Sequence, residues 1–198
     1  MLALSFEEIK NRLSTRTVGI AGAGGLGSNC AVALARVGIG KLIIADFDTV
    51  SRENLNRQYF FTDQIGLKKV DALKDNIERI NPDVLVEVHD LRLDAGNIAR
   101  IFRSCSIIVE AFDHAEMKKM LAETVLTEMP EKYLIIGSGV AGFGNNNAIK
   151  TTRSENIYIC GDQENETSPH LPPLAPRVGI VANMQANQVL EIFLQPGV

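Results

Sequence analysis

The segment from Gly22 to Gly27 reads GAGGLG and fits the pattern G-x-G-x-x-G of loops that bind nucleotide phosphates. In such loops the first glycine permits a tight turn, the second lets the backbone approach a phosphate, and the third allows a helix to pack closely on a strand. Unpaired N–H groups at the start of that helix then hold the anion. The pattern predicts a bound nucleotide; a turn with a purely structural role is the alternative.

Asp46 follows the apolar run KLIIA at residues 41–45, where a carboxylate can accept hydrogen bonds from ribose hydroxyls. The alternative is a carboxylate that caps a turn at the end of a strand. The glycine loop and Asp46 together do not separate ATP from NAD, because a dehydrogenase would carry the same two features.

The segment that follows Asp46 favours ATP. Asp46, Asp48, Asn54, Arg57 and Lys69 place two acids, an amide and two cations on one loop and the start of the next helix. The forked guanidinium of Arg57 could bind phosphate oxygens, and Lys69 could place a positive charge against an α-phosphate as negative charge develops there. A ribose needs fewer polar groups than this. The alternative is a solvated loop with surface charges.

The elements that must position these residues alternate between strand and helix patterns. This alternation predicts an α/β fold, Rossmann-like and doubly wound, with a mostly parallel sheet. Beyond Gly137, short β-like pieces separated by glycine and asparagine predict an antiparallel C-terminal extension. Strand patterns cover residues 17–21, 41–45, 84–88, 106–111 and 133–136, and helix patterns cover residues 28–37, 62–80, 94–102, 114–129 and 177–194.

Composition bounds the class of protein. The 198 residues are 45% hydrophobic and 22% charged, which predicts one domain over residues 1–198. The net charge is −4 and the basic residues are scattered, so we expect no nucleic-acid partner. No apolar run approaches the roughly 20 residues of a membrane span, and the N-terminus lacks the apolar core of a signal peptide. We therefore expect no membrane association and a cytoplasmic location.

The three cysteines, Cys30, Cys105 and Cys160, form no C-x-x-C pair. A disulfide framework or a four-thiolate zinc site is therefore not expected. Cys160 stands beside the proline-rich segment 161–176, GDQENETSPHLPPLAP, which predicts an extended surface loop rather than a helix or strand.

Several motifs, taken together, resemble the ThiF/MoeB/HesA family of bacterial relatives of ubiquitin-activating E1 enzymes, and most of all its short ThiF-type members. The order and spacing of the motifs fit as well. The matching pieces are GAGGLGS at 22–28, DFD at 46–48, ENLNRQ at 53–58, GLKKV at 66–70, INPDV at 80–84 and PRVGIVANMQANQVLEIFL at 176–194.

The resemblance implies ATP-dependent adenylation of the C-terminal glycine carboxylate of a small ubiquitin-like sulfur carrier that ends in diglycine. Pyrophosphate is released, and thiamin (thiazole) biosynthesis is the leading pathway. The resemblance also implies a homodimer. It assigns catalysis to Arg57, Lys69 and Asp113, Mg²⁺ to Asp113, and nucleotide binding to Gly22, Gly24, Gly25, Gly27, Asp46, Asp48, Asn54, Arg57 and Lys69.

The chain departs from the family pattern in three places. The two C-x-x-C pairs are absent, so no structural zinc is expected. An N-terminal arm that carries an arginine into a partner's site is not recognisable, and Arg12 or Arg16 could replace it. Asp113 is followed by His114, where the family has asparagine.

Three further interpretations stay open at this stage. Cys160 could transfer sulfur, as in some relatives, or pack at the end of a strand. The loop at 161–176 could cover the tail of the carrier or be a plain connection. The whole chain could be a carrier-binding module without turnover, or an NAD-dependent oxidoreductase, although the latter would need a substrate domain for which the chain has little room.

Overall fold

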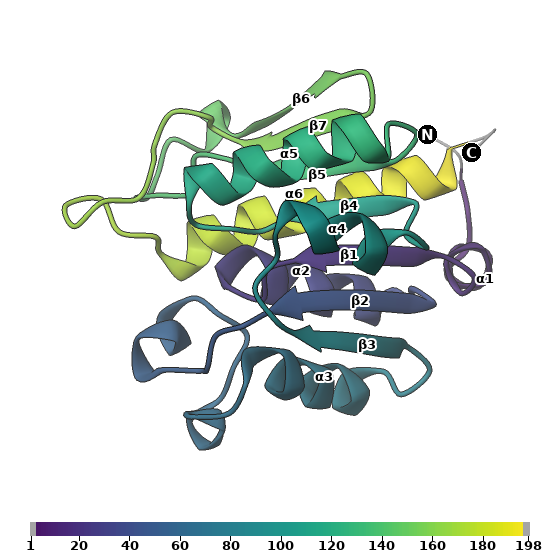
Figure 1. Ribbon diagram of the computed structural model, residues 1–198, viewed down its shortest axis with the longest axis horizontal. Coiled ribbons are helices and arrows are strands. Elements are labelled where there is room, and N and C mark those ends of the chain that lie inside the picture. The colour runs from purple at the N-terminus through teal and green to yellow at the C-terminus, as the bar shows by residue number, and fades with distance from the viewer. Residues whose placement is uncertain (1–2, 196–198) are drawn as a thin grey trace.

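The computed structural model describes residues 3–195, and within them one seven-stranded sheet has the order β3-β2-β1-β4-β5-β7-β6 (Figure 1). Neighbouring strands are parallel except for β6 and β7. This arrangement confirms the mostly parallel, Rossmann-like α/β fold. The strands are β1 (Thr17–Ala21), β2 (Lys41–Asp46), β3 (Leu85–Asp90), β4 (Ile107–Glu110), β5 (Tyr133–Gly137), β6 (Lys150–Ser154) and β7 (Ile157–Gly161).

Helices cover both faces of the sheet. The apolar side chains of α2, α3 and α6 form one buried cluster with alternate strand residues, and those of α4 and α5 form a second cluster with the residues between. The central strands are apolar apart from residues at their ends, because both of their faces are covered. The helices are α1 (Phe6–Leu13), α2 (Gly25–Arg36), α3 (Lys69–Ile80), α4 (Ala95–Phe102), α5 (Ala115–Glu128) and α6 (Ala175–Leu194).

The strand order reverses direction at β1. From β1 the chain moves outward through β2 to β3, then returns to place β4 on the other side of β1 and moves outward again through β5. In open α/β sheets the crevice outside the carboxyl ends of the strands at such a point is where ligands bind. The fold therefore predicts a ligand site at the loops after β1, β2 and β4.

The helix expected over residues 62–80 is wrong in its first part. Thr62–Gln64 forms a single 3₁₀ turn, and α3 begins only at Lys69. Between them Gly66 has φ of +92°, a left-handed conformation that glycine adopts easily. The segment also bonds across to Val50, whose carbonyl accepts from Gly66 N at 2.9 Å and whose N–H donates to Leu67 O at 2.8 Å. This non-local pairing replaces the helical bonds.

Other details also differ from the expectation. Helix α2 begins at Gly25 rather than at residue 28, so it includes the last three residues of the glycine motif. Helix α6 begins at Ala175, because Pro176 suits the first turn of a helix. Within the predicted antiparallel extension β6 alone is antiparallel, since β7 pairs in parallel with β5. Helix α1, which no sequence pattern had predicted, starts with a capping box between Ser5 and Glu8.

The loop between β7 and α6 projects from the body of the molecule (Figure 1). A buried ion pair fixes its base. The Asp162 carboxylate accepts from the N–H groups of Glu164 and Asn165, both at 3.0 Å, and pairs with the Arg177 guanidinium. Arg177 also donates to the carbonyl of Gly144 at 2.7 Å. The two side chains of the pair are 4% and 1% exposed, so the pair joins both ends of the loop inside the core.

The Asp162 anchor makes stability depend on pH. Burial raises its pKa, but the hydrogen bonds from Asn165 and Glu164 and the Arg177 charge outweigh burial and lower the pKa to about 2, from 3.8. A lowered folded-state pKa stabilises the fold above the unfolded value and loses that contribution as the pH falls toward 2. Lowering the pH from 6 to 3 should therefore reduce the free energy of unfolding by about 1 kcal/mol through the protonation of Asp162.

Urea unfolding at both pH values checks this expectation, with Asp162→Asn/Arg177→Met as the control because it carries neither charge. The wild type should lose about 1 kcal/mol more than the double variant across this range. An equal loss in both proteins would show that Asp162 titrates normally.

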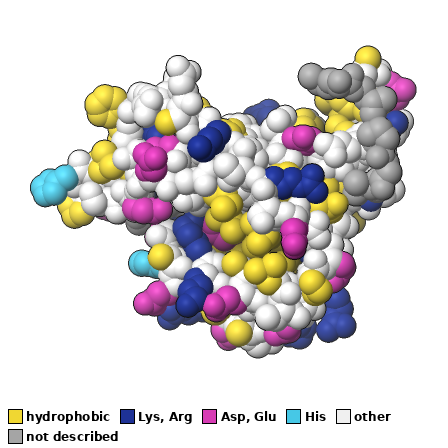
Figure 2. All heavy atoms as spheres, turned by 90° about the horizontal axis from the view of Figure 1, so that it is seen from above, with side chains coloured by type: hydrophobic (Ala, Val, Ile, Leu, Met, Phe, Trp, Pro, Cys, Tyr) yellow, Lys and Arg dark blue, Asp and Glu magenta, His cyan; other side chains and the backbone are white. Residues whose placement is uncertain are grey.

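The surface seen from above carries basic and acidic side chains interspersed, without a large field of one sign (Figure 2). In the part of the chain that the structure describes, no helix combines the length and apolar character that crossing a bilayer requires.

Candidate nucleotide site

The glycine loop forms a turn that two of its glycines make possible. Gly22 has φ of +103°, and its N–H donates to the carbonyl of Ala45 at 2.9 Å, which joins the ends of β1 and β2. A Cβ on Gly27 would lie 1.9 Å from the carbonyl oxygen of Gly22, so the helix can approach the strand only without one. Gly24 and Gly25 face outward and line a cavity, with the start of α2 behind them. The four predicted glycines thus divide into two that shape the turn and two that face the cavity.

Asp46, the last residue of β2, holds the glycine loop in place through hydrogen bonds. Its carboxylate accepts the N–H of Ala23 at 2.7 Å and the N–H of Asp48 at 2.8 Å. Burial raises the pKa of Asp46, and the two backbone N–H groups together with the nearby Lys69 charge work against that rise. The carboxylate still lines the cavity, so it can accept further hydrogen bonds from a ligand.

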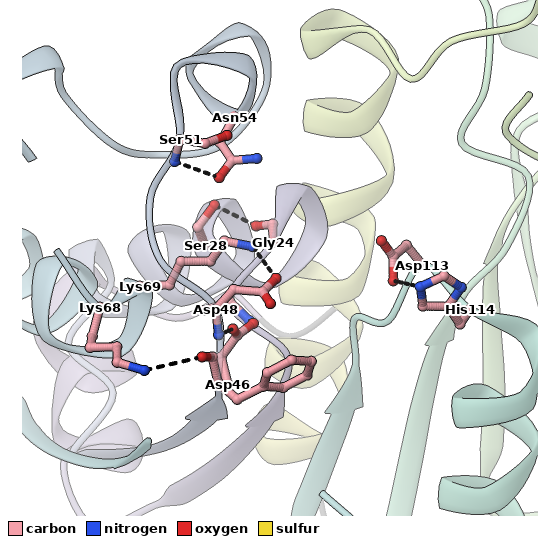
Figure 3. Close-up of polar contacts among 12 residues, drawn as sticks. Gly24, Ser28, Asp46, Asp48, Ser51, Asn54, Lys68, Lys69, Asp113 and His114 are labelled. Atoms are coloured by element: carbon pink, nitrogen blue, oxygen red, sulfur yellow. Dashed lines mark hydrogen bonds and ion pairs between the residues drawn. The ribbon is translucent and has the colours of Figure 1, made fainter. Parts of the chain in front are cut away.

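Lys69 and Asp48 form an ion pair at the cavity wall, with 2.7 Å between Nζ and Oδ2 (Figure 3). The lysine is the first residue of α3 and its side chain is only 7% exposed, whereas that of Asp48 is 48% exposed. The late start of α3 is what places this side chain at the cavity. A buried ammonium held by one exposed carboxylate can be shared with an incoming anion.

Arg57 lies on the loop between β2 and α3 and also lines the cavity. Its guanidinium donates to the Glu53 carbonyl at 3.2 Å and to the Asn56 side chain at 2.7 Å. Its backbone carbonyl accepts from the amide of Asn29, which lies on α2 and also donates to Gly25 O. The loop that carries Arg57 is thereby fixed to the first turn of the glycine-loop helix.

The structure does not place Asn54 at the cavity. Its side-chain oxygen accepts the N–H of Ser51 at 3.0 Å and caps the 3₁₀ turn Arg52–Asn56 (Figure 3). Its neighbour Gln58, for which the sequence suggested no role, does line the cavity. The one sequence feature that could have indicated Gln58 is its position as the last residue of the ENLNRQ motif.

Asp113 faces the other polar groups from the turn between β4 and α5 (Figure 3). Its side chain is 85% exposed, and His114 Nε2 lies 3.7 Å from its Oδ1. An oxygen donor with so few protein partners is available for a cation or for solvent. Of the predicted polar residues, Asp46, Asp48, Arg57, Lys69 and Asp113 line one cavity of about 360 Å³.

The opposite wall of this cavity comes from later parts of the chain. It includes residues 137–140 at the end of β5, residues 166–168 and Pro173 of the projecting loop, and Lys118 of α5. Sequence patterns did not indicate Lys118, because nothing in its spacing distinguishes it from a surface lysine. A second hollow of about 210 Å³ adjoins Asp46 and has a largely apolar lining. Its apolar side chains are Phe47, Leu91, Leu93, Phe112 and Met117.

A protein-family model described as the ThiF family matches residues 1–197. The chain belongs to the ThiF family. This membership confirms the family resemblance that the sequence motifs indicated.

Curated relatives of this ThiF-family chain include adenylyltransferases. It is 31% identical over 191 residues to the adenylyltransferase and sulfurtransferase MOCS3 of Caenorhabditis briggsae, an alignment that covers 92% of this chain and 47% of that protein. It is 29% identical to the molybdopterin-synthase adenylyltransferase of Salmonella typhimurium, over 96% of this chain and 78% of that protein. The chain thus spans about half the length of the first relative.

Among solved structures, the ThiF-family fold matches the tRNA N6-threonylcarbamoyladenosine dehydratase TcdA of E. coli in complex with ATP. The TM-score is 0.85 with 22% identity, and the match covers 95% of this chain and 89% of that one. At this identity the likeness shows the fold.

The arginines proposed as substitutes for the family's N-terminal arm lie far from the cavity of their own chain. Arg12 is on α1, at the end of the sheet opposite the projecting loop (Figure 1), and the Arg16 guanidinium lies 5.1 Å from the ring centre of Phe193 near the end of α6. Among residues 3–195 no three His, Cys, Asp or Glu side chains gather as a metal site.

Cys160 is fully buried in β7, where burial raises the pKa of its thiol and Thr151 Oγ1 lies 3.6 Å from the sulfur. A sulfur nucleophile needs an accessible thiolate, so this environment favours packing. We expect Cys160→Ala to cost about 1 kcal/mol of stability and to leave any exchange of pyrophosphate into ATP within twofold of the wild type. Pyrophosphate exchange and urea unfolding measure the two quantities; an exchange rate reduced tenfold in a folded variant would assign the thiol a chemical role.

Proposed function

We propose that this chain transfers AMP from ATP to the C-terminal carboxylate of a small ubiquitin-like sulfur carrier that ends in diglycine. The observation that carries the proposal is the cavity at the reversal of strand order, which brings the glycine loop together with the cations of Arg57 and Lys69 and the carboxylates of Asp46, Asp48 and Asp113. The adenylyltransferase relatives support it.

The nucleotide fits one side of this arrangement. The apolar hollow beside Asp46 suits a purine ring, and the Asp46 carboxylate suits the ribose hydroxyls. The phosphates then reach the N–H groups at the start of α2, with Arg57 and Lys69 on the same wall. Both cations face the position where negative charge grows as the bond between the α- and β-phosphates breaks.

Asp113 fits the divalent cation that nucleotide chemistry employs. It is an exposed carboxylate at the cavity, and Mg²⁺ prefers one or two carboxylate oxygens supplemented by phosphate and water. A bound Mg²⁺ would supply charge neutralisation on the phosphates. The residue itself provides a negative oxygen donor held across the cavity from the two cations.

The acyl partner fits the opposite wall. A carboxylate that enters between residues 137–140 and the projecting loop would face the phosphates. Its oxygen forms a bond to the α-phosphorus, the bond from that phosphorus to the bridging oxygen breaks, and pyrophosphate leaves with the electron pair. Catalysis of this step is positioning plus charge stabilisation, and no protein nucleophile is needed.

A homodimer and a role in thiamin (thiazole) biosynthesis are parts of the same proposal. Both are supported by the ThiF-type motifs at residues 22–28, 46–48 and 53–58. A protein with these properties would be found in the cytoplasm, where carrier and ATP are both present.

The decisive experiment is exchange of labelled pyrophosphate into ATP, measured with Mg²⁺ and a diglycine-ended carrier of the thiamin type. We expect exchange that depends on the carrier and disappears when its last glycine is deleted. Binding of ATP and carrier without exchange would identify a module that has lost turnover. Retention of NAD with no affinity for ATP would overturn the proposal in favour of an oxidoreductase.

A further inference from the structure

A buried ion pair lies beneath the part of the cavity wall that carries Asp113. Glu110, the last residue of β4, is fully buried, and both of its carboxylate oxygens accept from Lys118 Nζ, at 3.1 and 2.8 Å. Lys118 is in the first turn of α5 and lines the cavity. None of the sequence motifs accounts for this pair.

The lysine has no N–H group left for a ligand. An ammonium has three N–H donors, and Lys118 uses two of them on Glu110 and the third on the carbonyl of Gly137, at 2.7 Å. A phosphate or carboxylate in the cavity would have to break one of these bonds. Lys118 is therefore placed to hold protein segments rather than substrate.

The segments that it holds are those on which the proposed reaction depends. Glu110 also accepts the N–H of Phe112 at 2.6 Å, so its carboxylate closes the short turn that leads to Asp113 and α5. Gly137 ends β5, and the cavity-lining residues 138–140 follow it directly. The Lys118 ammonium thus connects the turn that carries Asp113, the proposed metal ligand, to the segment 137–140, which is proposed to face the carrier's carboxylate.

Asp113 depends on this support because its own side chain has little. It is 85% exposed, and the structure gives it His114 as its ionic neighbour. The position of the Asp113 carboxylate relative to residues 138–140 is accordingly set by the backbone of the turn. We propose that the Glu110–Lys118 pair is a positioning device that fixes the Asp113 turn against the end of β5 and so aligns the attacking carboxylate with the nucleotide. This inference rests on the proposed function.

The test separates positioning from simple stabilisation by means of four variants. Lys118→Met leaves the buried Glu110 carboxylate without its cation and should lower the Tm. Glu110→Gln/Lys118→Met removes both charges, keeps an acceptor for Phe112, and should recover most of that Tm. Lys118→Arg keeps the charge and its donors. Lys119→Met makes the same change one residue further along α5 at an exposed position, and serves as the control.

We expect the folded double variant to lose about 100-fold in the kcat of pyrophosphate exchange, while its Kd for ATP stays within about threefold of the wild type. Lys118→Arg should keep more exchange than Lys118→Met, and Lys119→Met should match the wild type. Recovery of exchange together with Tm in the double variant would overturn the inference and leave the pair a purely structural role. Equal exchange in Lys118→Arg and Lys118→Met would also count against it.

Hydrogen exchange of the backbone amides gives a second readout that needs no turnover. Amides in residues 111–114 should exchange about tenfold faster in the double variant than in Lys119→Met, because the bridge to β5 is gone. Unchanged exchange there would overturn the positioning role even if the wild type proved active. If the wild type showed no pyrophosphate exchange but the amides behaved as expected, the proposed function would fail while the mechanical role of the pair stood.

Discussion

Asp113→Ala is expected to reduce pyrophosphate exchange by at least about 100-fold and to leave the fold intact. The carboxylate is the one predicted site residue across the cavity from Arg57 and Lys69, and it is available to a cation that bridges to phosphate. Its side chain is 85% exposed, so truncation removes almost no packing. The free energy of unfolding should change by less than about 0.5 kcal/mol.

The measurements are exchange rate at saturating ATP and carrier, and urea unfolding of the same preparation. Asp75→Ala is a matched control, because Asp75 is an exposed aspartate on α3 that does not line the cavity. Raising the Mg²⁺ concentration should partly rescue Asp113→Ala if weaker metal binding causes the loss. Near-normal exchange in the variant would remove Asp113 from the proposed metal site.

Arg177→Met should destabilise the protein by about 3–5 kcal/mol, the usual cost of removing one partner of a buried ion pair. The change leaves the Asp162 carboxylate buried without its cation, and it also leaves the carbonyl of Gly144 without its donor. Because the pair joins both ends of the loop between β7 and α6, the loop should become the first site of proteolytic cleavage.

Urea unfolding and limited proteolysis test this expectation, and Asp162→Asn/Arg177→Met again provides the comparison. The double variant should regain a large part of the lost stability, since it buries no unpaired charge. Loss of exchange activity should follow loop cleavage, because residues 166–168 and Pro173 line the cavity. A stability loss below about 1 kcal/mol in the single variant would mean that the pair behaves as if exposed to solvent.

The sequence predicted most reliably those features that are local. The strand, glycine loop and helix between residues 17 and 36 depend on apolar runs and on glycines at fixed spacing, and Asp46 follows from the end of the next strand. These are contacts between neighbours in sequence or across a single βαβ unit. The placement of Asp46 and Asp113 at one cavity also followed, because both stand at or just after the carboxyl ends of parallel strands, which meet at one edge of the sheet.

Two of the differences from the sequence predictions, at residues 62–68 and at Lys118, depend on partners far away in sequence. The helical periodicity of residues 62–80 was real, but the bonds from Gly66 and Leu67 to Val50 outcompete the first turn. Asn54 was assigned to the nucleotide, yet its side chain caps its own turn, a local use that asparagine commonly serves. Lys118 looks like any surface lysine until folding places Gly137 beside it.

The two walls of the cavity come from different stretches of the chain. Residues 22–69 supply the groups proposed for the ribose and the phosphates, and residues 137–173 supply the wall proposed for the acyl partner. Substitutions in the acyl-partner wall can therefore change which acyl partner binds without changing the residues proposed for the ribose and the phosphates. Exchange of residues 137–174 between distant members of the family should transfer the choice of carrier while the affinity for ATP is inherited from the recipient.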